Sequence, residues 1–177
     1  HWVNHFPKDK TYGTLIDERD GNEYKTVVIG NRMWMAENLR FADSAAYTNL
    51  KGQMWCYNYN VKMCSLGGAY YTWPAVMNFH RQWNDTSATE LIKTPYHQGI
   101  CPNGWHVPAL DDFELLRMEY KDGRKLKIAG ENTRTWEDVT NISGLSILPV
   151  GAYNLLGRFE VGFSNFWLSS EYGKTSA

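Results

Sequence analysis

Two short runs rich in β-branched and aromatic residues lie near the N-terminus and are separated by a turn signal. Residues 14–17 precede the sequence Asp-Gly-Asn at 20–22, and residues 24–29 follow it. An Asp-Gly pair between strand-forming runs favours a tight turn, because glycine tolerates a positive φ. Gly-Asn at 30–31 marks a second turn before residues 32–35. The pattern therefore predicts three short strands joined by two turns.

Two later segments carry helix signals. Thr72 is a suitable N-cap and Pro74 is tolerated in a first turn, so a helix is predicted to run to about Arg81. From Pro108 to Tyr120, apolar residues recur every three to four positions, which is typical of an amphipathic helix. Acidic residues in the first turns of this second helix suit its dipole, and an Asp-Gly pair follows its predicted end.

The rest of the chain is loop-like with short β-like pieces. Residues 37–68 are rich in Asn, Gly, Ser and Tyr, and residues 82–100 form a polar insert without a strong pattern. Further short β-like pieces are predicted at 53–57, 144–149, 157–159 and 165–170. Two main helices among short antiparallel strands and long loops define an α+β domain.

The length of 177 residues is typical of one domain. Residues 1–12 lack periodicity and are predicted to be an N-terminal tail or lead-in strand, and residues 13–177 are predicted to form the single domain. The chain begins at His1 and shows no signal peptide, which favours a processed chain or a fragment. No stretch approaches the roughly 20 apolar residues that span a bilayer, so no transmembrane segment is expected.

The charge of the chain argues against two classes of partner. Eighteen Lys and Arg residues against nineteen Asp and Glu residues leave a net charge of -1. Charges of both signs are interspersed, and no basic or acidic tail is present. We therefore expect neither a nucleic acid nor an anionic membrane surface as the partner.

Few residues are candidates for metal binding or catalysis. The His residues form no HxH pair and no CxxC is present, so no transition-metal site is predicted, and His106 is expected to bond a nearby backbone group. There is no Gly-x-Ser-x-Gly sequence, and no residue is assigned a catalytic role. Calcium is the only cofactor retained, as a minority hypothesis without EF-hand spacing. Its candidate oxygen ligands are Asp17, Asp20, Asn22, Asn84 and Asp85.

Aromatic residues make up 15% of the chain, including eight Trp and eleven Tyr. They could form a core, because Trp is usually largely buried, or a surface on which ligand rings stack. Aromatic residues in loops are the better candidates for contact with a ligand. The predicted ligand-binding residues lie in polar, loop-like segments and are Trp55, Tyr57, Tyr59, Trp83 and Tyr96.

Several segments, taken in order, resemble one protein family. The most specific is Gln-Gly-Ile-Cys-Pro-Asn-Gly-Trp-His-Val-Pro at 98–108. Others are Ile-Gly-Asn-Arg-Met-Trp-Met-Ala-Glu-Asn-Leu at 29–39 and Phe-Trp-Leu-Ser-Ser-Glu-Tyr at 166–172. From about Gly13 to Tyr172 the chain resembles the Fibrobacter succinogenes major paralogous domain. The Gly-Trp-His run and the later Phe-Trp pair also resemble, more distantly, the formylglycine-generating-enzyme fold, a relative of C-type-lectin-like domains.

The resemblance implies a C-type-lectin-like fold in an exported protein of Gram-negative bacteria of the Bacteroidota and Fibrobacter groups. Such a protein is extracellular or on the outer-membrane surface, in many members as a lipoprotein. It also implies that the Trp residues of the shared motifs belong to the core, namely Trp34, Trp73, Trp105 and Trp167. One departure is Ala109, which stands where members place a Ser or Thr helix cap. Losing that cap costs about 1 kcal/mol unless Asp111 or Asp112 compensates.

The three cysteines are an odd number, and the resemblance implies a reason. Members continue beyond the Ser-Ser-Glu-Tyr run and end in a stretch with a further cysteine. Since this chain stops at Ala177, the domain is predicted to lack its C-terminal strands and Cys101 to lack its partner. We favour a Cys56–Cys64 disulfide; the alternative joins Cys64 to Cys101 and leaves Cys56 free.

Three functions remain as hypotheses. The first is a non-catalytic cell-surface binding or adhesion module for a glycan or protein ligand. The second is an accessory subunit of an outer-membrane surface complex, in which an open strand edge or apolar patch contacts other subunits. The third, an enzyme of the formylglycine-generating type, requires a late reactive cysteine pair, and no cysteine follows Cys101.

Overall fold

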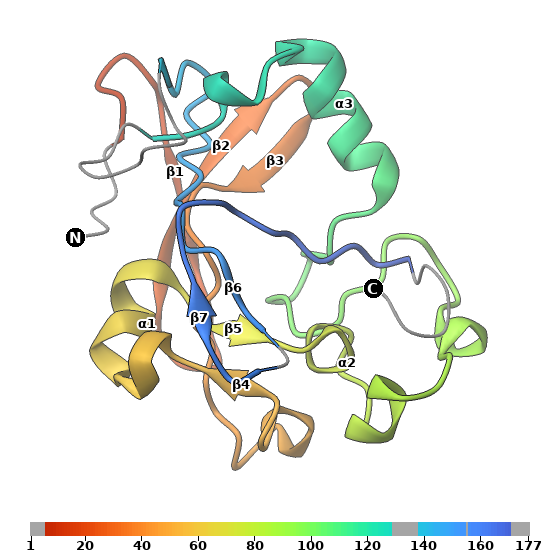
Figure 1. The fold of residues 1–177 in the computed structure, drawn as a ribbon. Coiled ribbons are helices and arrows are strands. Elements are labelled where there is room, and N and C mark those ends of the chain that lie inside the picture. The colour runs from red at the N-terminus through yellow and green to blue at the C-terminus, as the bar shows by residue number, and fades with distance from the viewer. Residues whose placement is uncertain (1–5, 129–137, 155, 171–177) are drawn as a thin grey trace.

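The computed structural model describes residues 6–128, 138–154 and 156–170, which form the coloured ribbon of Figure 1. Within these residues the chain combines helices with small antiparallel sheets, which confirms the predicted α+β class. The strands are β1 (Gly13–Ile16), β2 (Glu23–Ile29), β3 (Arg32–Met35), β4 (Met54–Trp55), β5 (Tyr70–Tyr71), β6 (Ala152–Tyr153) and β7 (Phe159–Glu160). The α-helices are α1 (Val61–Gly67), α2 (Trp73–Val76) and α3 (Leu110–Tyr120). The short 3-10 helices are η1 (Thr48–Leu50), η2 (Tyr57–Tyr59), η3 (Arg81–Asn84), η4 (Thr89–Leu91) and η5 (Gly123–Lys125).

The three N-terminal strands form one antiparallel sheet with β2 in its centre (Figure 1). Both predicted turns are confirmed. The Asp17 N–H donates to the Asn22 carbonyl at 2.8 Å, and Gly21 has a φ of 73°. Gly30, between β2 and β3, has a φ of 60°. The sheet therefore follows from local turn chemistry at two glycines.

Two smaller antiparallel pairs complete the strands. β4 pairs with β5, which places Trp55 opposite Tyr70. β6 pairs with β7, which places Tyr153 opposite Phe159. The β-like pieces predicted at 53–57 and 157–159 thus contain β4 and the beginning of β7.

Two other predicted β-like pieces do not form strands. Residues 144–149 and 165–170 take part in no ladder among the described residues, and only an isolated bridge joins Ile147 to Lys127. The backbone turns at Gly144 and Ser146, whose φ angles are 77° and 59°. Left-handed residues interrupt an extended strand, so apolar composition alone was misleading there.

The first predicted helix is shorter than expected. Thr72 is its N-cap, as predicted, and accepts a hydrogen bond from the Ala75 N–H. The helix nevertheless ends at Val76 rather than near Arg81. Asn78 adopts a φ of 56°, and such a left-handed residue stops helical propagation.

The second predicted helix is present as α3, which begins at Leu110 just after the predicted start. Ala109 has no capping side chain, and the Asp112 carboxylate instead accepts the Ala109 N–H at 2.9 Å. Asp112 therefore supplies the acidic half of a capping box. Lys121, with a φ of 55°, ends the helix before the Asp-Gly pair that was predicted to end it.

Helix α1 was not predicted. Asn60 caps it by accepting a hydrogen bond from the Lys62 N–H, and Gly68 follows its end with a φ of 84°. An added Cβ at Gly68 would lie 2.3 Å from the Asn38 Cβ, so glycine also permits close packing there. The helix spans only seven residues, and tertiary packing rather than an apolar period stabilises helices this short.

Two apolar clusters form the interior. The first surrounds α2 and contains Phe41, Leu50, Trp73, Ala75, Val76, Met77, Ala88, Ile100 and Val107. The second lies between the three-stranded sheet and α3 and contains Val27, Ile29, Ala36, Leu116 and Leu145. In the N-terminal lead-in, Phe6 and Tyr12 pack against this second cluster, and the Tyr12 hydroxyl donates to the Gly144 carbonyl at 2.8 Å.

Candidate functional site

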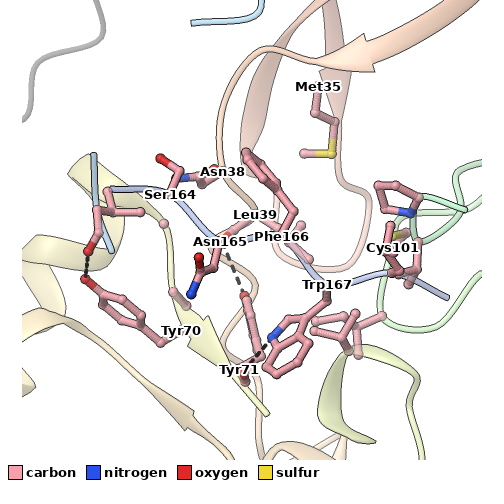
Figure 2. Close-up of a pocket in the computed structure, with 18 of the residues that line it drawn as sticks. Met35, Asn38, Leu39, Tyr70, Tyr71, Cys101, Ser164, Asn165, Phe166 and Trp167 are labelled. Carbon is pink, nitrogen blue, oxygen red and sulfur yellow. Dashed lines mark hydrogen bonds between the residues drawn. The ribbon is translucent and has the colours of Figure 1, made fainter. Parts of the chain in front are cut away.

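A cleft of about 1690 Å³ opens in the middle of the molecule, and Figure 2 shows part of its lining. Strand β3 and residues 36–39 line it, together with β5 and the beginning of α2. Further lining comes from residues 100–101, 104–108, 145–148, 150–154 and 164–168. Segments that are far apart in the sequence thus meet around one space.

Two indole groups hold the last described segment against the cleft. The Trp73 Nε1–H donates to the Leu168 carbonyl at 2.8 Å. The Trp167 Nε1–H donates to the Tyr71 carbonyl at 2.9 Å, as Figure 2 shows. Removing one partner from such a partly buried hydrogen bond leaves the other group unsatisfied, so these two bonds fix that wall of the cleft.

The four Trp residues assigned to the core divide into two kinds. Trp73 is buried, and Trp34 and Trp167 pack partly buried against the two apolar clusters. Trp105 is half-buried and lies outside both clusters, but like the other three it lines the cleft. All four indole side chains therefore contribute to the wall of the cleft.

Asp112 makes several polar contacts at one part of the cleft. Its carboxylate lies 3.0 Å from His106 Nε2 and 3.2 Å from Arg32 Nε. The partner of His106 is thus a carboxylate rather than the predicted backbone group. With the Ala109 N–H as a third contact, Asp112 is tied to the loop before α3 and to β3.

Tyr96, one of the predicted ligand-binding residues, belongs to this polar region. Its hydroxyl donates to Asp111 at 2.6 Å and accepts from Arg32 at 3.2 Å. The hydrogen bond from Tyr96 lowers the pKa of the Asp111 carboxyl. The ring also meets the His106 ring with centroids 5.0 Å apart. Tyr96 therefore connects the polar insert to α3 and β3.

Three of the five predicted ligand-binding residues are brought together, and they meet three aromatic rings that the sequence did not indicate. We call this set the aromatic cluster. It comprises Trp55, Tyr57, Tyr59, Tyr70, Tyr153 and Phe159. β4, β5, η2 and the β6–β7 hairpin supply these side chains.

The rings of the aromatic cluster are arranged around Tyr153 and Phe159. The Trp55 and Tyr153 rings are stacked, with centroids 4.7 Å apart and an interplanar angle of 26°. Tyr59 meets both Tyr153 and Phe159 edge-on, and its hydroxyl lies 3.0 Å from that of Tyr153. Tyr59 is 66% exposed, so this pair of hydroxyl groups lies at the surface. Trp55, Tyr70 and Tyr153 also line the cleft, so the two features adjoin.

The Cys56–Cys64 disulfide predicted from the sequence is present, with a Cα–Cα distance of 5.0 Å. The alternative Cys64–Cys101 pairing is wrong, because Cys101 is free. The disulfide joins the end of β4 to α1 and so closes the loop that carries η2. It thereby holds Tyr57 and Tyr59 beside the β6–β7 hairpin.

The β6–β7 hairpin presents Tyr153 and Phe159 because its backbone is held at two points. The Asn154 Oδ1 accepts the N–H groups of Leu156 and Arg158 at 3.0 and 3.1 Å. Gly151 has a φ of 75°, and its N–H donates to the Phe163 carbonyl at 2.7 Å. These contacts set the direction of the hairpin toward η2.

Trp83 lies apart from the aromatic cluster. It is half-buried and packs against the cluster around α2, where it lines the cleft. The sequence reasoning missed Tyr70, Tyr153 and Phe159. A hairpin signal was available for the last two, since a Gly-Arg turn at 157–158 lies between them, but no local pattern places that hairpin beside η2.

Of the side chains considered for calcium, Asp17, Asp20, Asn22 and Asn84 have hydrogen-bond partners within the protein. The Asp17 carboxylate accepts hydrogen bonds from the Arg19 side chain at 2.8 and 2.6 Å. Asp20 accepts the Asn22 side-chain amide at 2.7 Å, and the Asn84 amide donates to the Gln53 side chain at 2.8 Å. Among the described residues, no three His, Cys, Asp or Glu side chains gather as a metal site would require.

Comparison with known proteins places the chain in a family. The sequence model of the Fibrobacter succinogenes major domain family matches residues 27–177 of this chain. No curated protein and no solved structure matches the chain. None of the helices in the described part of the chain has the length and apolar character to cross a membrane. Because the match covers most of the sequence, the chain belongs to the Fibrobacter succinogenes major domain family.

Proposed function

We propose that this domain is a non-catalytic binding module and that the aromatic cluster binds a glycan. The observation that carries the proposal is the exposed hydroxyl pair of Tyr59 and Tyr153, 3.0 Å apart, on a group of aromatic rings beside the cleft. Aromatic faces pack against the C–H faces of sugar rings, and phenol hydroxyls bond sugar hydroxyls. Both kinds of group therefore occur together here.

The cluster is also suited to binding because it is held in place before a ligand arrives. The disulfide and the β6–β7 hairpin fix the two sides of the cluster. Tyr and Trp side chains have few rotatable bonds, so they lose little entropy when a ligand orders them. A preorganised surface converts more of its contact energy into affinity.

The proposed setting is the exterior of a Gram-negative bacterium, either extracellular or on the outer-membrane surface with a lipid anchor. The Cys56–Cys64 disulfide supports export, because disulfides persist mainly in oxidising compartments. The C-type-lectin-like fold and an origin in the Bacteroidota remain predictions from the resemblance.

A glycan array followed by titration calorimetry tests the proposal. Tyr59→Ala and Tyr153→Ala should weaken binding of the best glycan by at least about tenfold, the size typical of a central aromatic contact. Tyr59→Phe, which removes only one hydroxyl, should have a smaller effect. Tyr96→Ala is the matched control, because Tyr96 is also exposed but lies with Arg32 and Asp111.

The measurements can reject this proposal in two ways. The absence of glycan binding by the wild-type protein would overturn it. So would unchanged affinity in both Tyr59→Ala and Tyr153→Ala proteins whose thermal unfolding temperatures match the wild type.

The second candidate, an accessory subunit of an outer-membrane surface complex, has a separate observation in its favour. Val28 and Met33 lie opposite each other on β2 and β3 and are 62% and 58% exposed. Exposed apolar side chains that adjoin one another are typical of contact surfaces. Native mass spectrometry of the protein isolated gently from its own cells would show stable co-subunits if this candidate is correct.

An enzyme of the formylglycine-generating type is the weakest candidate. It needs a pair of reactive cysteines, and Cys56 and Cys64 are already joined. Desolvation raises the pKa of the remaining thiol, Cys101, to about 12. Cysteine reacts as the thiolate, so a thiol with this pKa is a poor nucleophile at neutral pH.

A further inference from the structure

Strand β3 is an outer strand of the three-stranded sheet among the described residues. The Ala36 N–H donates to the Lys25 carbonyl, so the backbone groups of Ala36 point toward β2. Along an antiparallel strand, residues whose N–H and C=O groups point toward the neighbouring strand alternate with residues whose groups point away from it. Arg32 and Trp34 therefore direct their backbone groups toward β2, whereas Met33 and Met35 direct theirs away from it. Within the described part of the chain, nothing pairs these outward N–H and C=O groups.

This free edge borders the cleft. Residues 31–39 line the cleft without interruption, and residues 145–148 and 164–168 line it as well. Figure 2 shows Met35 and Phe166 among the side chains that line this space. The free backbone groups therefore face a recess rather than a flat surface.

The lining of the recess is mainly apolar, and its few charges are already paired. Apart from Trp34 and Met35, it includes Leu39, Ile147 and Phe166. The Arg32 guanidinium lies 3.2 Å from Asp112, and the Glu37 carboxylate lies 3.6 Å from Arg40. An occupant with unpaired charges would find no complementary charge and would lose hydration.

We propose that β3 and the cleft bind an extended, uncharged and apolar peptide segment of a partner protein by β-strand addition. Met33 and Met35 would each exchange an N–H and a C=O hydrogen bond with the segment, as in a regular antiparallel or parallel ladder. The cleft would take its apolar side chains. A recessed edge admits a single extended chain and hinders a second folded domain, which argues against self-pairing of two β3 edges.

This interaction uses other residues than the proposed glycan site, although both border the cleft. β3 lies in the three-stranded sheet, whereas the aromatic cluster is built on β4, β5, η2 and the β6–β7 hairpin. A failure of glycan binding therefore leaves the peptide proposal standing, and a failure of peptide binding leaves the glycan proposal standing.

Amide hydrogen exchange followed by NMR gives the direct test. The probe is a capped peptide of alternating valine and threonine, about six residues long, which is a usual strand length. The Met33 and Met35 amides should exchange fast in the free protein and slow down at least about tenfold at saturating peptide. The Trp34 amide, which already faces β2, should change little and serves as an internal control.

A pair of substitutions separates backbone pairing from side-chain contact. Met33→Pro removes one outward N–H, and proline is tolerated on an edge strand when its nitrogen faces away from the neighbouring strand. Met33→Thr changes the side chain but keeps the N–H. We expect Met33→Pro to weaken peptide binding at least about tenfold and Met33→Thr to weaken it much less.

Methylated peptides make the test independent of the fold of any variant. The N–H groups of successive peptide residues point to opposite edges of the extended peptide, so methylation of every second nitrogen removes all the donors of one edge. Methylation of the edge that faces β3 should abolish binding, whereas methylation of the other edge should leave the affinity unchanged. Equal effects of the two patterns would overturn the proposal, as would unchanged exchange at Met33 and Met35. Protection of these amides by protein dimerisation, in the absence of peptide, would also overturn it in favour of self-association.

Discussion

The phenol oxygens of Tyr59 and Tyr153 lie 3.0 Å apart, although 94 residues separate them in the sequence. The hydrogen bond between them raises the pKa of Tyr153, because the neutral hydroxyl takes part in the bond. Replacing Tyr59 by Phe should therefore lower the pKa of Tyr153 toward the ordinary value of about 10. Absorbance titration in the near ultraviolet, with Tyr153→Phe to identify the signal, measures this change.

The raised pKa of Tyr153 also determines how the stability of the folded protein changes with pH. A raised folded-state pKa means that the folded protein holds the proton more tightly, so the contribution is complete below about pH 10. It is lost as the pH rises through the raised pKa. An unchanged Tyr153 titration in the Tyr59→Phe protein would contradict a direct bond between the hydroxyls.

Asp17 and Arg19 make the protein sensitive to acid. Desolvation of the buried Asp17 carboxyl raises its pKa, but the hydrogen bonds from Arg19 lower it, and the net result is a lowered pKa. Because the folded pKa is lower than the unfolded value, the stabilisation is present above about pH 4 and is lost as the pH falls through the folded pKa. Asp17→Asn should cost about 2 kcal/mol in free energy of unfolding at neutral pH.

Urea unfolding at neutral and acidic pH measures this effect. The difference between wild type and Asp17→Asn should shrink toward zero at low pH. Asp20→Asn is the matched control, since Asp20 is exposed and its carboxylate accepts hydrogen bonds from the nearby Asn22. An equal pH dependence in all three proteins would contradict the role given to Asp17.

The Cys56–Cys64 disulfide should contribute both stability and the geometry of the aromatic cluster. The loop it closes, with a sequence separation of 8, suggests about 2.5 kcal/mol from restriction of the unfolded chain. The double substitution of Cys56 and Cys64 by Ser should lower the free energy of unfolding by this amount and weaken glycan binding. Cys101→Ser is the control for loss of a thiol and should leave glycan binding unchanged.

Gly151 and Gly157 form a matched pair for testing the β6–β7 hairpin. Both have a positive φ, at 75° and 72°. An added Cβ would lie 1.7 Å from the Glu160 carbonyl oxygen at Gly151, but 3.5 Å from the nearest atom, the Tyr153 hydroxyl oxygen, at Gly157. Gly157→Ala should therefore cost about 1 kcal/mol, and Gly151→Ala about 3 kcal/mol or more. Thermal or urea unfolding compares the two, and equal costs would show that only the backbone angle matters.

The local features of the fold could be predicted from the sequence. The turns before and after β2 depend on Gly21 and Gly30, and the start of α2 depends on Thr72. The Cys56–Cys64 pair closes a short loop, so its two residues are rarely far apart. In each case residues close in sequence determine the backbone angles or contacts, and a linear pattern contains that information.

The end of α2 and the missing strands at 144–149 and 165–170 could not be predicted in the same way. Ser146 adopts a left-handed angle that serine seldom adopts, and Asn78 is of a type that tolerates such angles but does not require them, so the signal for the helix end is weak. Helix α1 likewise lacks a period long enough to recognise. Packing against neighbouring segments decides these cases.

The sequence by itself determined the family, the α+β class, the first sheet and the disulfide. Only the tertiary structure decided that Trp55, Tyr57 and Tyr59 meet Tyr153 and Phe159, that Trp83 and Tyr96 lie elsewhere, and that the β3 edge faces a cleft. The physical reason is the range of the interactions. Turns and caps act within a few residues, whereas ring contacts and cleft walls depend on how the hydrophobic interior packs distant segments together.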